Sequence, residues 1–130
     1  METEIEIQVR STHIDFLGHV NNAVYLEFME WGRTDWYEKI GEDFEDLLDE
    51  GIAVVVVNID INFNKEIMLG EKVRVRTIPL QKNNKSYKHR QEIYNEDDEL
   101  VADAVVTEVL LDRTKGEAVY PHEELSKQFD

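Results

Sequence analysis

The sequence predicts an α+β domain in which an antiparallel β-sheet packs around one long central helix. Three observations predict it: an alternating first segment, a long amphipathic helix after it, and several strand-like segments with short connections. Short connections favour antiparallel pairing, because parallel strands need a crossover of a dozen or more residues. With 130 residues the chain has the size of one domain, and we expect a single domain over residues 1–130.

The helix predicted over residues 22–40 is the strongest element. At helical spacing its apolar face combines Tyr25, Phe28, Met29, Gly32, Trp36 and Ile40. Its polar face combines Glu27, Glu30, Thr34 and Glu38. Asn21 or Asn22 can cap its start, and Gly41 can end it. The broad aromatic face predicts a deeply buried helix, and Gly32 in its middle allows another backbone to come close.

The other elements are strands and two short helices. Residues 2–10 and 57–64 alternate, and so do residues 72–76, which lead into 78–80. A further strand is expected at 85–94, after the turn signal Asn83-Asn84. Residues 100–111 are apolar on both faces around 104–106, which predicts a central strand covered on both sides. A last strand is expected at 117–120, and short helices at 44–49 and 122–129. One helix covers only one face of such a sheet, so the remaining apolar strand surface predicts a homodimer or homotetramer.

The composition narrows the classes of function. The absence of cysteine excludes a thiol nucleophile, disulfides and zinc–thiolate sites. A net charge of −15 disfavours binding to nucleic acid or to an anionic membrane. The longest apolar run, residues 52–57, is far too short to span a membrane, and the charged residues 1–10 do not resemble a signal peptide. We therefore expect a cytoplasmic protein.

Basic residues concentrate in one part of this acidic chain, residues 65–90, here called the basic segment. It holds eight of the fourteen basic residues: Lys65, Lys72, Arg74, Arg76, Lys82, Lys85, Lys88 and Arg90. Only Glu66 and Glu71 oppose them within the segment. The segment is either a site for an anionic ligand or a set of solvated strand faces, and the pattern alone favours neither.

The residues that can carry chemistry lie between Arg10 and Arg33. Asp15, Gly18, His19, Asn21 and Asn22 crowd into a loop and the first turn of the predicted helix. A helix N-terminus offers free N–H groups and a positive dipole end, which can polarise a carbonyl or bind an oxyanion. A carboxylate a few residues upstream can attack that carbonyl or activate a water. The pattern is therefore typical of acyl-transfer chemistry.

This stretch, H-x-D-x-x-G-H-V-N-N-A-x-Y-L followed by Glu and Arg, resembles the 4-hydroxybenzoyl-CoA thioesterase family of hot-dog proteins. It is closest in motif to the long-chain acyl-CoA thioesterase branch, and the order of elements extends the resemblance over nearly the whole chain. The resemblance implies a hot-dog fold and an acyl-CoA thioesterase that hydrolyses the thioester to free acid and CoA. It also implies a homo-oligomer that needs no metal or redox cofactor.

The resemblance assigns roles to individual residues. Asp15 matches the catalytic carboxylate, acting as nucleophile or general base. Gly18 and His19 match the region that receives the thioester carbonyl, together with the helix start. The predicted catalytic set is Asp15, Gly18 and His19, and the substrate-binding residues at the helix start are Asn21, Asn22, Ala23 and Tyr25, the last lining the acyl pocket.

Two further groups follow from the same resemblance. His13 occupies a place where histidine is familiar in the long-chain branch. The family's CoA contacts correspond to residues 82–90, inside the basic segment. The predicted CoA contacts are Lys82, Lys85, Ser86, Lys88 and Arg90.

Structural roles are the alternatives for these residues. Asp15 can cap a turn, and His19 can orient the loop by hydrogen bonding. Asn21 and Asn22 can be helix caps, and Tyr25 can belong to the core. Glu30 can pair with Arg33 or Thr34, although a helix glutamate catalyses in a few hot-dog thioesterases. His13, Asp15 and His19 can also be interpreted as a metal site, but their spacing fits no regular element.

Two other functions are compatible with such a fold. A hydratase or dehydratase acting on acyl-CoA or an acyl carrier pairs an Asp or Glu with a His, which Asp15 and His19 imitate. The N-N-A-x-Y run does not belong to those enzymes. A non-catalytic acyl-CoA-binding module is the other alternative, because a fold alone does not determine function.

Overall fold

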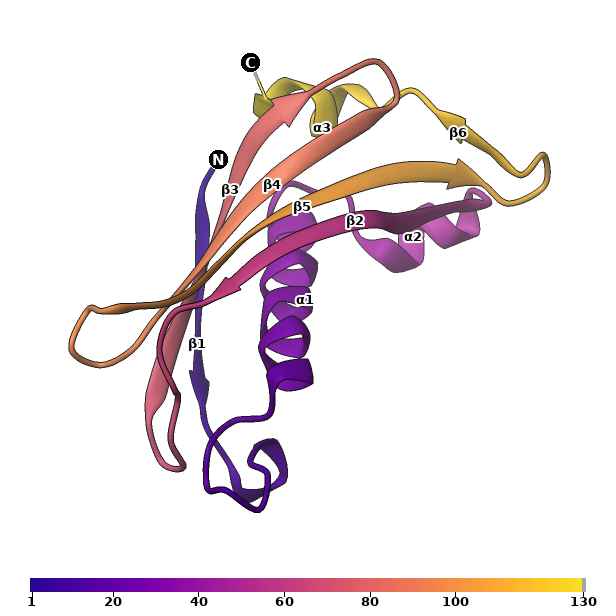
Figure 1. The fold of residues 1–130 in the computed structure, drawn as a ribbon. Helices are drawn as coiled ribbons and strands as arrows, with labels where there is room; N and C mark the ends of the chain where they lie inside the picture. The colour runs from indigo at the N-terminus through magenta and orange to yellow at the C-terminus, as the bar shows by residue number, and fades with distance from the viewer. Residues whose placement is uncertain (130) are drawn as a thin grey trace.

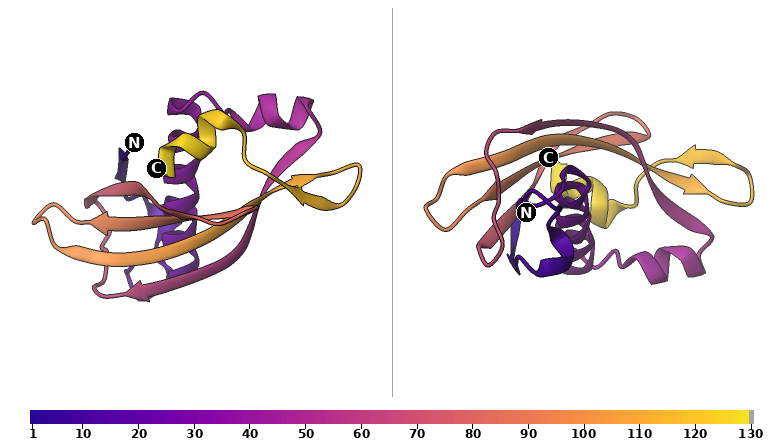
Figure 2. Two further views of the ribbon diagram at one scale, coloured as in Figure 1. Left: turned by 90° about the horizontal axis from the view of Figure 1, so that it is seen from above. Right: turned by 60° about the horizontal axis from the view of Figure 1, so that its bottom comes forward.

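The computed structural model describes residues 1–129, in which a curved antiparallel sheet wraps around one helix (Figure 1). The strands are β1 (Thr3–Gln8), β2 (Ile52–Phe63), β3 (Lys72–Lys82), β4 (Ser86–Tyr94), β5 (Leu100–Asp112) and β6 (Glu117–Val119). Their order is β1-β3-β4-β5-β2, with β6 added to β5. Figure 2 shows helix α1 (Asn22–Lys39) on the concave side of the sheet. The predicted fold class, a hot-dog arrangement, is confirmed.

Helix α1 begins and ends where the sequence predicted. The side chain of Asn21 accepts a hydrogen bond from the Ala23 amide, which satisfies one of the free N–H groups at the helix start. The predicted apolar face is buried throughout. Two residues outside that face, Arg33 and Tyr37, are buried as well, so the helix is covered over more than its apolar stripe.

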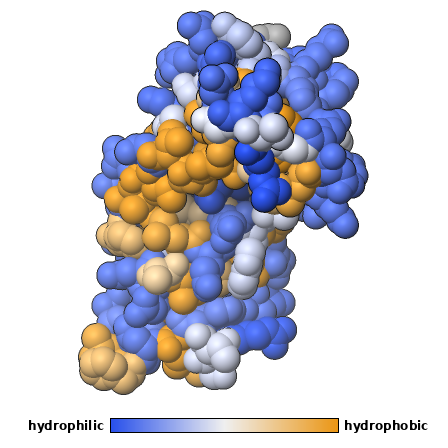
Figure 3. Space-filling model, turned by 90° about the vertical axis from the view of Figure 1, so that its right-hand side faces the viewer, coloured by the Kyte–Doolittle hydropathy of each residue, from blue (hydrophilic) through white to orange (hydrophobic). Residues whose placement is uncertain are grey.

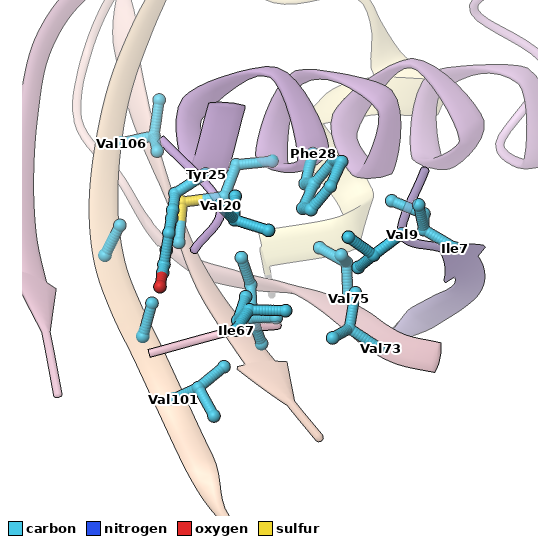
Figure 4. Packing of buried hydrophobic residues seen from close by; sticks show 14 residues of the cluster. Ile7, Val9, Val20, Tyr25, Phe28, Ile67, Val73, Val75, Val101 and Val106 are labelled. Atoms are coloured by element: carbon cyan, nitrogen blue, oxygen red, sulfur yellow. The ribbon is translucent and has the colours of Figure 1, made fainter. Parts of the chain in front are cut away.

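The core has two hydrophobic clusters along α1. Figure 4 shows the first, in which Phe28 of α1 lies on the side of Val75 of β3 and Tyr25 lies on the side of Val20 and Val106. The second surrounds the C-terminal half of α1. It contains Trp36, Tyr37, Ile40, Leu47, Tyr87, Leu110 and Leu125.

A buried polar network adjoins the second cluster. The Tyr37 hydroxyl donates to Oε2 of Glu108 at 2.5 Å and lies 2.6 Å from the Tyr87 hydroxyl. Nδ1 of His89 lies 2.6 Å from Oε1 of the same glutamate. All four side chains are fully buried, and burial raises the pKa of both tyrosines, helped by the Glu108 carboxylate. The sequence analysis did not anticipate this network.

The structure corrects two details of the strands. β2 begins at Ile52, five residues before the predicted start, because the apolar run 52–57 continues the strand into a bulge between Val56 and Asn58. β5 pairs with β4 and β2 as a central strand, as predicted, but its outer face is only half-buried. The predicted cover on both faces is therefore absent from the single chain.

The remaining elements lie where the sequence predicted them, apart from one short 3-10 helix. The loop before α1 contains a short 3-10 helix, η1 (Ser11–His13), that was not predicted. The short helices appear as α2 (Phe44–Asp49), α3 (Glu123–Ser126) and η2 (Lys127–Phe129). No helix within residues 1–129 combines the length and apolar character needed to cross a membrane.

Candidate active site

The loop before α1 is tied to the loop that follows β2. Two isolated bridges pair Ile14 with Val20 and His19 with Met68. The Val20 amide donates to the Ile67 carbonyl at 2.8 Å. Gly18 makes the turn between these bridges with a φ of 89°, a conformation that glycine adopts without steric cost. The pairing brings His19 beside residues that lie more than forty positions later in the chain.

A pocket of about 260 Å³ opens where these two loops meet the start of α1. It is lined by His19, Val20, Asn22, Tyr25, Phe63, Asn64, Lys65 and Glu66. Three of the predicted site residues, His19, Asn22 and Tyr25, therefore come together. Phe63, Asn64, Lys65 and Glu66 were not predicted to belong to the site.

Tyr25 joins the core to this pocket. Its hydroxyl donates to the Lys65 carbonyl at 3.0 Å, and its ring meets the Phe63 ring edge-on at 5.2 Å. Burial raises the pKa of the Tyr25 hydroxyl, and the carboxylates of Glu66 and Glu71 add to this effect. Tyr25 thus serves both as a core residue and as part of the pocket wall.

The imidazole of His19 faces a carboxylate inside the pocket. Its Nε2 atom lies 3.5 Å from Oε2 of Glu66. Sequence analysis missed Glu66, although it is one of only two acidic residues in the basic segment. An acidic residue among so many basic ones is unusual, and this pattern could have singled out Glu66. Its proximity to His19, however, depends on the pairing of two loops, which no local sequence pattern predicts.

Asp15 makes a structural contact within its own loop. Its Oδ1 accepts the Leu17 amide at 2.9 Å, and its own amide donates to the His19 carbonyl at 2.9 Å. Asp15 is half-buried and does not line the pocket. The turn-forming role named above as an alternative is therefore present, one backbone hydrogen bond away from His19.

At the start of α1, one polar residue caps the helix and the next one lines the pocket. Asn21 is the cap, and the amide of Ala23 is taken by the Asn21 side chain. Asn22 lines the pocket, and its backbone N–H finds no acceptor within residues 1–129. Of the predicted helix-start residues, Asn22 therefore has the backbone donor best suited to a ligand.

His13 and Glu30 lie outside the pocket. The His13 ring packs against Phe28 and Trp31 at centroid distances of 5.1 and 6.0 Å, and its Nδ1 accepts the Arg10 amide. Glu30 is exposed, and its backbone carbonyl accepts from the Thr34 hydroxyl. No group of three potential metal ligands, including the interpretation with His13, is assembled in the described part of the chain.

Arg33 does not pair with Glu30, which was one of the expected contacts. It turns inward instead and donates to Oε1 of Gln91 at 2.8 Å. The Gln91 amide in turn donates to the Met29 carbonyl and to the Thr77 hydroxyl. These buried contacts fasten α1 to β4 and β3.

Most basic residues of this segment form ion pairs, chiefly on β3 and β4. Three basic residues of β3 pair with glutamates in or just before β1: Lys72 with Glu6, Arg74 with Glu4 and Arg76 with Glu2. Arg90 of β4 pairs with Glu92 and Asp103. Lys65 pairs with Glu99 and is the one basic residue of the segment among those that line the pocket. These ion pairs favour the interpretation of the paired residues as solvated strand faces.

The predicted CoA contacts lie around the β3–β4 turn. Lys82 donates to the Ser126 hydroxyl, and Lys85 lies over the Tyr120 ring at 5.1 Å. Lys88 makes no ion pair with any residue from 1 to 129. Figure 1 shows this turn at the top of the molecule and the start of α1 at the bottom. One chain therefore does not bring the two predicted halves of the site together.

The family model described as the thioesterase-like superfamily matches residues 9–129. The chain belongs to the thioesterase-like superfamily. This match confirms the family resemblance carried by the H-x-D-x-x-G-H-V-N-N-A-x-Y-L run, and it spans the pocket, α1 and strands β2 to β6. This thioesterase-like chain is also similar to individual thioesterases over nearly its whole length.

The long-chain acyl-CoA thioesterase FadM of Escherichia coli (strain K12) is 36% identical, over 98% of this chain and 96% of that protein. The crystal structure of DHNA-CoA thioesterase from Staphylococcus aureus is 25% identical, with a TM-score of 0.90 over 97% of this chain and 89% of that one. The 1,4-dihydroxy-2-naphthoyl-CoA thioesterase Slr0204 from Synechocystis, 18% identical, shares the fold with a TM-score of 0.92, covering 99% and 96%.

Proposed function

We propose that this thioesterase-like chain is an acyl-CoA thioesterase, which hydrolyses an acyl-CoA to the free acid and CoA. The observation that carries the proposal is the pocket at the start of α1, lined by His19, Asn22 and Tyr25 of the family motif. The near full-length similarity to the long-chain acyl-CoA thioesterase FadM supports acyl-CoA as the substrate class. A cytoplasmic location and the absence of a cofactor requirement are parts of the same proposal.

The start of α1 supplies the electrostatic part of the proposed mechanism. The thioester carbonyl oxygen accepts the free N–H of Asn22 at the positive end of the helix dipole. As a nucleophile adds to the carbonyl carbon, negative charge develops on that oxygen and is stabilised there. The exposed Phe63 ring, which packs against Tyr25 at the pocket wall, contacts the first part of the acyl chain.

Asp15 supplies the carboxylate, as nucleophile or as general base toward water. Its Oδ1 is held by the Leu17 amide, while a carboxylate has two oxygens and further lone pairs to offer. The hydrogen bond between the Asp15 amide and the His19 carbonyl links this carboxylate to the wall of the pocket. A ligand or a second chain that reaches over the exposed Phe16–Leu17 tip would complete the enclosure.

We also propose that the active form is a dimer joined through β2. This strand ends the sheet, so one row of its backbone groups has no strand partner among residues 1–129. It carries two exposed valines, Val56 at 39% and Val57 at 55%. Figure 3 shows hydrophobic side chains gathered over this region, between polar surfaces. A long, apolar edge strand is a template for pairing with another strand.

Two-fold symmetric pairing of β2 with its copy fits the site. The copies of β2 would run antiparallel, so the β3–β4 turn of the partner would lie at the same end of the assembly as the start of α1. The basic turn and the pocket would then serve one acyl-CoA. Light scattering should give about 31 kDa, twice the 15.3 kDa of one chain, or a multiple of it. A mass of one chain at micromolar concentration contradicts the dimer.

Release of free thiol from a panel of acyl-CoA esters tests the activity. The chain contains no cysteine, so a thiol reagent reports CoA alone. Thiol release with formation of the free acid is the expected result. Conversion of the acyl group without thiol release would instead indicate a hydratase or dehydratase. Binding of acyl-CoA with neither reaction would indicate a binding module.

A further inference from the structure

A carboxylate outside the His13–Leu26 motif lies at the candidate active site. Glu66 lines the pocket, and its Oε2 lies 3.5 Å from Nε2 of His19. No other carboxylate lines this pocket. The second acidic residue of the basic segment, Glu71, is engaged elsewhere, because it accepts the Met68 amide.

The backbone on both sides of Glu66 is held firmly. The Lys65 amide donates to the Val101 carbonyl at 3.1 Å, and the Lys65 carbonyl accepts the Tyr25 hydroxyl. Ile67 is fully buried, and its carbonyl accepts the Val20 amide. The Glu66 side chain is exposed, but these contacts hold its backbone beside His19, within reach of the imidazole.

The backbone of His19 is also held in place by hydrogen bonding. Its carbonyl accepts the Asp15 amide, and the residue forms a bridge with Met68 in the same loop that carries Glu66. A carboxylate attracts a protonated nitrogen, so the 3.5 Å contact with Glu66 favours a proton on Nε2. The other ring nitrogen, Nδ1, has no partner within residues 1–129 and remains available to a reacting group.

We propose that Glu66 is the positioning residue of the thioesterase reaction: it orients His19 through Nε2, so that Nδ1 carries protons between water and the departing sulfur. This inference rests on the proposed function. When the C–S bond breaks, its electron pair leaves with sulfur, and the Nδ1 proton of the His19 imidazolium moves to that sulfur. The neutral ring then takes a proton from the water whose oxygen enters the acid, and the imidazolium is restored.

The step balances in both roles of Asp15. If Asp15 is the nucleophile, His19 takes the proton of the water that hydrolyses the acyl-Asp15 intermediate; if Asp15 is the general base, it takes the water proton and passes it to His19. One water adds to the acyl group, one proton reaches the CoA sulfur, and His19 ends in its starting state. Glu66 takes part in both halves, because its carboxylate lies beside Nε2 and keeps that nitrogen turned toward it while Nδ1 gives up and regains its proton. A group that acts in this way should influence turnover and leave substrate binding nearly unchanged.

A double-mutant cycle between Glu66 and His19 tests the proposal by steady-state kinetics. Glu66→Gln keeps the size and removes the charge, and we expect kcat to fall roughly 10-fold with KM within about twofold. His19→Asn should lower kcat by about 100-fold. The double variant should be no slower than His19→Asn, because Glu66 acts only through His19. Glu66→Asp, which retains a carboxylate, should recover part of the loss.

Matched controls exclude effects of folding and of net charge. Glu117→Gln removes one negative charge on the distant β6 and should keep wild-type kinetics. Thermal unfolding of every variant verifies the fold. Wild-type kcat in Glu66→Gln, or losses that multiply in the double variant, would overturn the proposal while leaving the thioesterase function intact.

A second measurement does not depend on turnover. Nitrogen NMR of the four histidines should show the Nε2-protonated form for neutral His19 in the wild type and a mixture of both tautomers in Glu66→Ala. An identical His19 spectrum in the two proteins would refute the positioning contact itself. Absence of thiol release by the wild type would refute the thioesterase function, and the NMR result would still decide whether Glu66 orients His19.

Discussion

The Oδ1 atom of Asp15 accepts a hydrogen bond from the Leu17 amide at 2.9 Å, so the proposed catalytic carboxylate also forms the turn that carries it. Asparagine makes the same turn contact through its own side-chain oxygen. Asp15→Asn should therefore lower kcat by about 100-fold or more while the melting temperature and acyl-CoA affinity stay close to wild type. Steady-state kinetics and thermal unfolding measure both quantities.

Asp15→Ala is the matched comparison, because it loses both the charge and the turn contact. We expect it to be as inactive as Asp15→Asn and less stable. Wild-type turnover in Asp15→Asn would assign Asp15 to the turn alone. The search for the catalytic group would then pass to His19 and to Glu30.

Lysines around the β3–β4 turn should contribute to binding of CoA phosphates. We expect the combined substitution of Lys82, Lys85 and Lys88 by glutamine to raise KM roughly 10-fold with a smaller change in kcat, because such contacts exist before and during the reaction. The effect should shrink as ionic strength rises. Arg90 already pairs with Glu92 and Asp103, so Arg90→Gln should have a smaller effect. Unchanged KM and CoA affinity in the triple variant would leave these lysines as a solvated face.

Gly32 should not tolerate a larger side chain. A Cβ atom there would lie 2.9 Å from Cγ1 of Val75 and 3.1 Å from polar atoms of both Gln91 and Thr77, all on buried strand residues. Alanine adds about 1 kcal/mol of helix propensity, whereas overpacking costs roughly 1–3 kcal/mol. We expect Gly32→Ala to lower the free energy of unfolding, measured with urea at fixed protein concentration. The exposed change Glu38→Ala serves as control, and a stabilised Gly32→Ala would contradict the close packing of α1 on β3.

The buried tyrosines should make the fold sensitive to alkali. Burial and the neighbouring Glu108 raise the pKa of Tyr37 and of Tyr87 well above 10.0 in the folded chain. Above about pH 10 these tyrosines lose their protons in the unfolded chain and keep them in the folded chain. The free energy of unfolding therefore falls as pH rises. The loss approaches about 1.4 kcal/mol per pH unit for each tyrosine.

Substitution separates this effect from general alkaline damage. Tyr37→Phe should be less stable than wild type near neutral pH, because it loses the hydrogen bond to Glu108, but its stability should fall less steeply above pH 10. Urea unfolding at about pH 8 and about pH 11 measures the difference. The exposed Tyr120→Phe should follow the wild-type curve. Equal slopes for all three proteins would contradict the coupling.

The fold was largely predictable because its signals are local. The face of α1, from Tyr25 to Ile40, follows from a spacing of three and four residues, and the cap at Asn21 lies next to the helix that it starts. The alternation of Ile5 and Ile7 with Glu4 and Glu6 likewise determines which face of β1 is buried. In each case the residues that decide the structure are neighbours in the chain.

The sequence by itself thus determined the α+β class, the long buried helix and the family motif from His13 to Tyr25. Only the tertiary structure decided which distant groups meet. The strand order β1-β3-β4-β5-β2 pairs the basic segment with carboxylates and leaves β2 at the edge. Loop pairing brings Glu66 to His19, and the sheet brings His89 to Glu108. These contacts join residues 19 or more positions apart, and their formation depends on how the strands and loops pack, which no periodicity within one segment encodes.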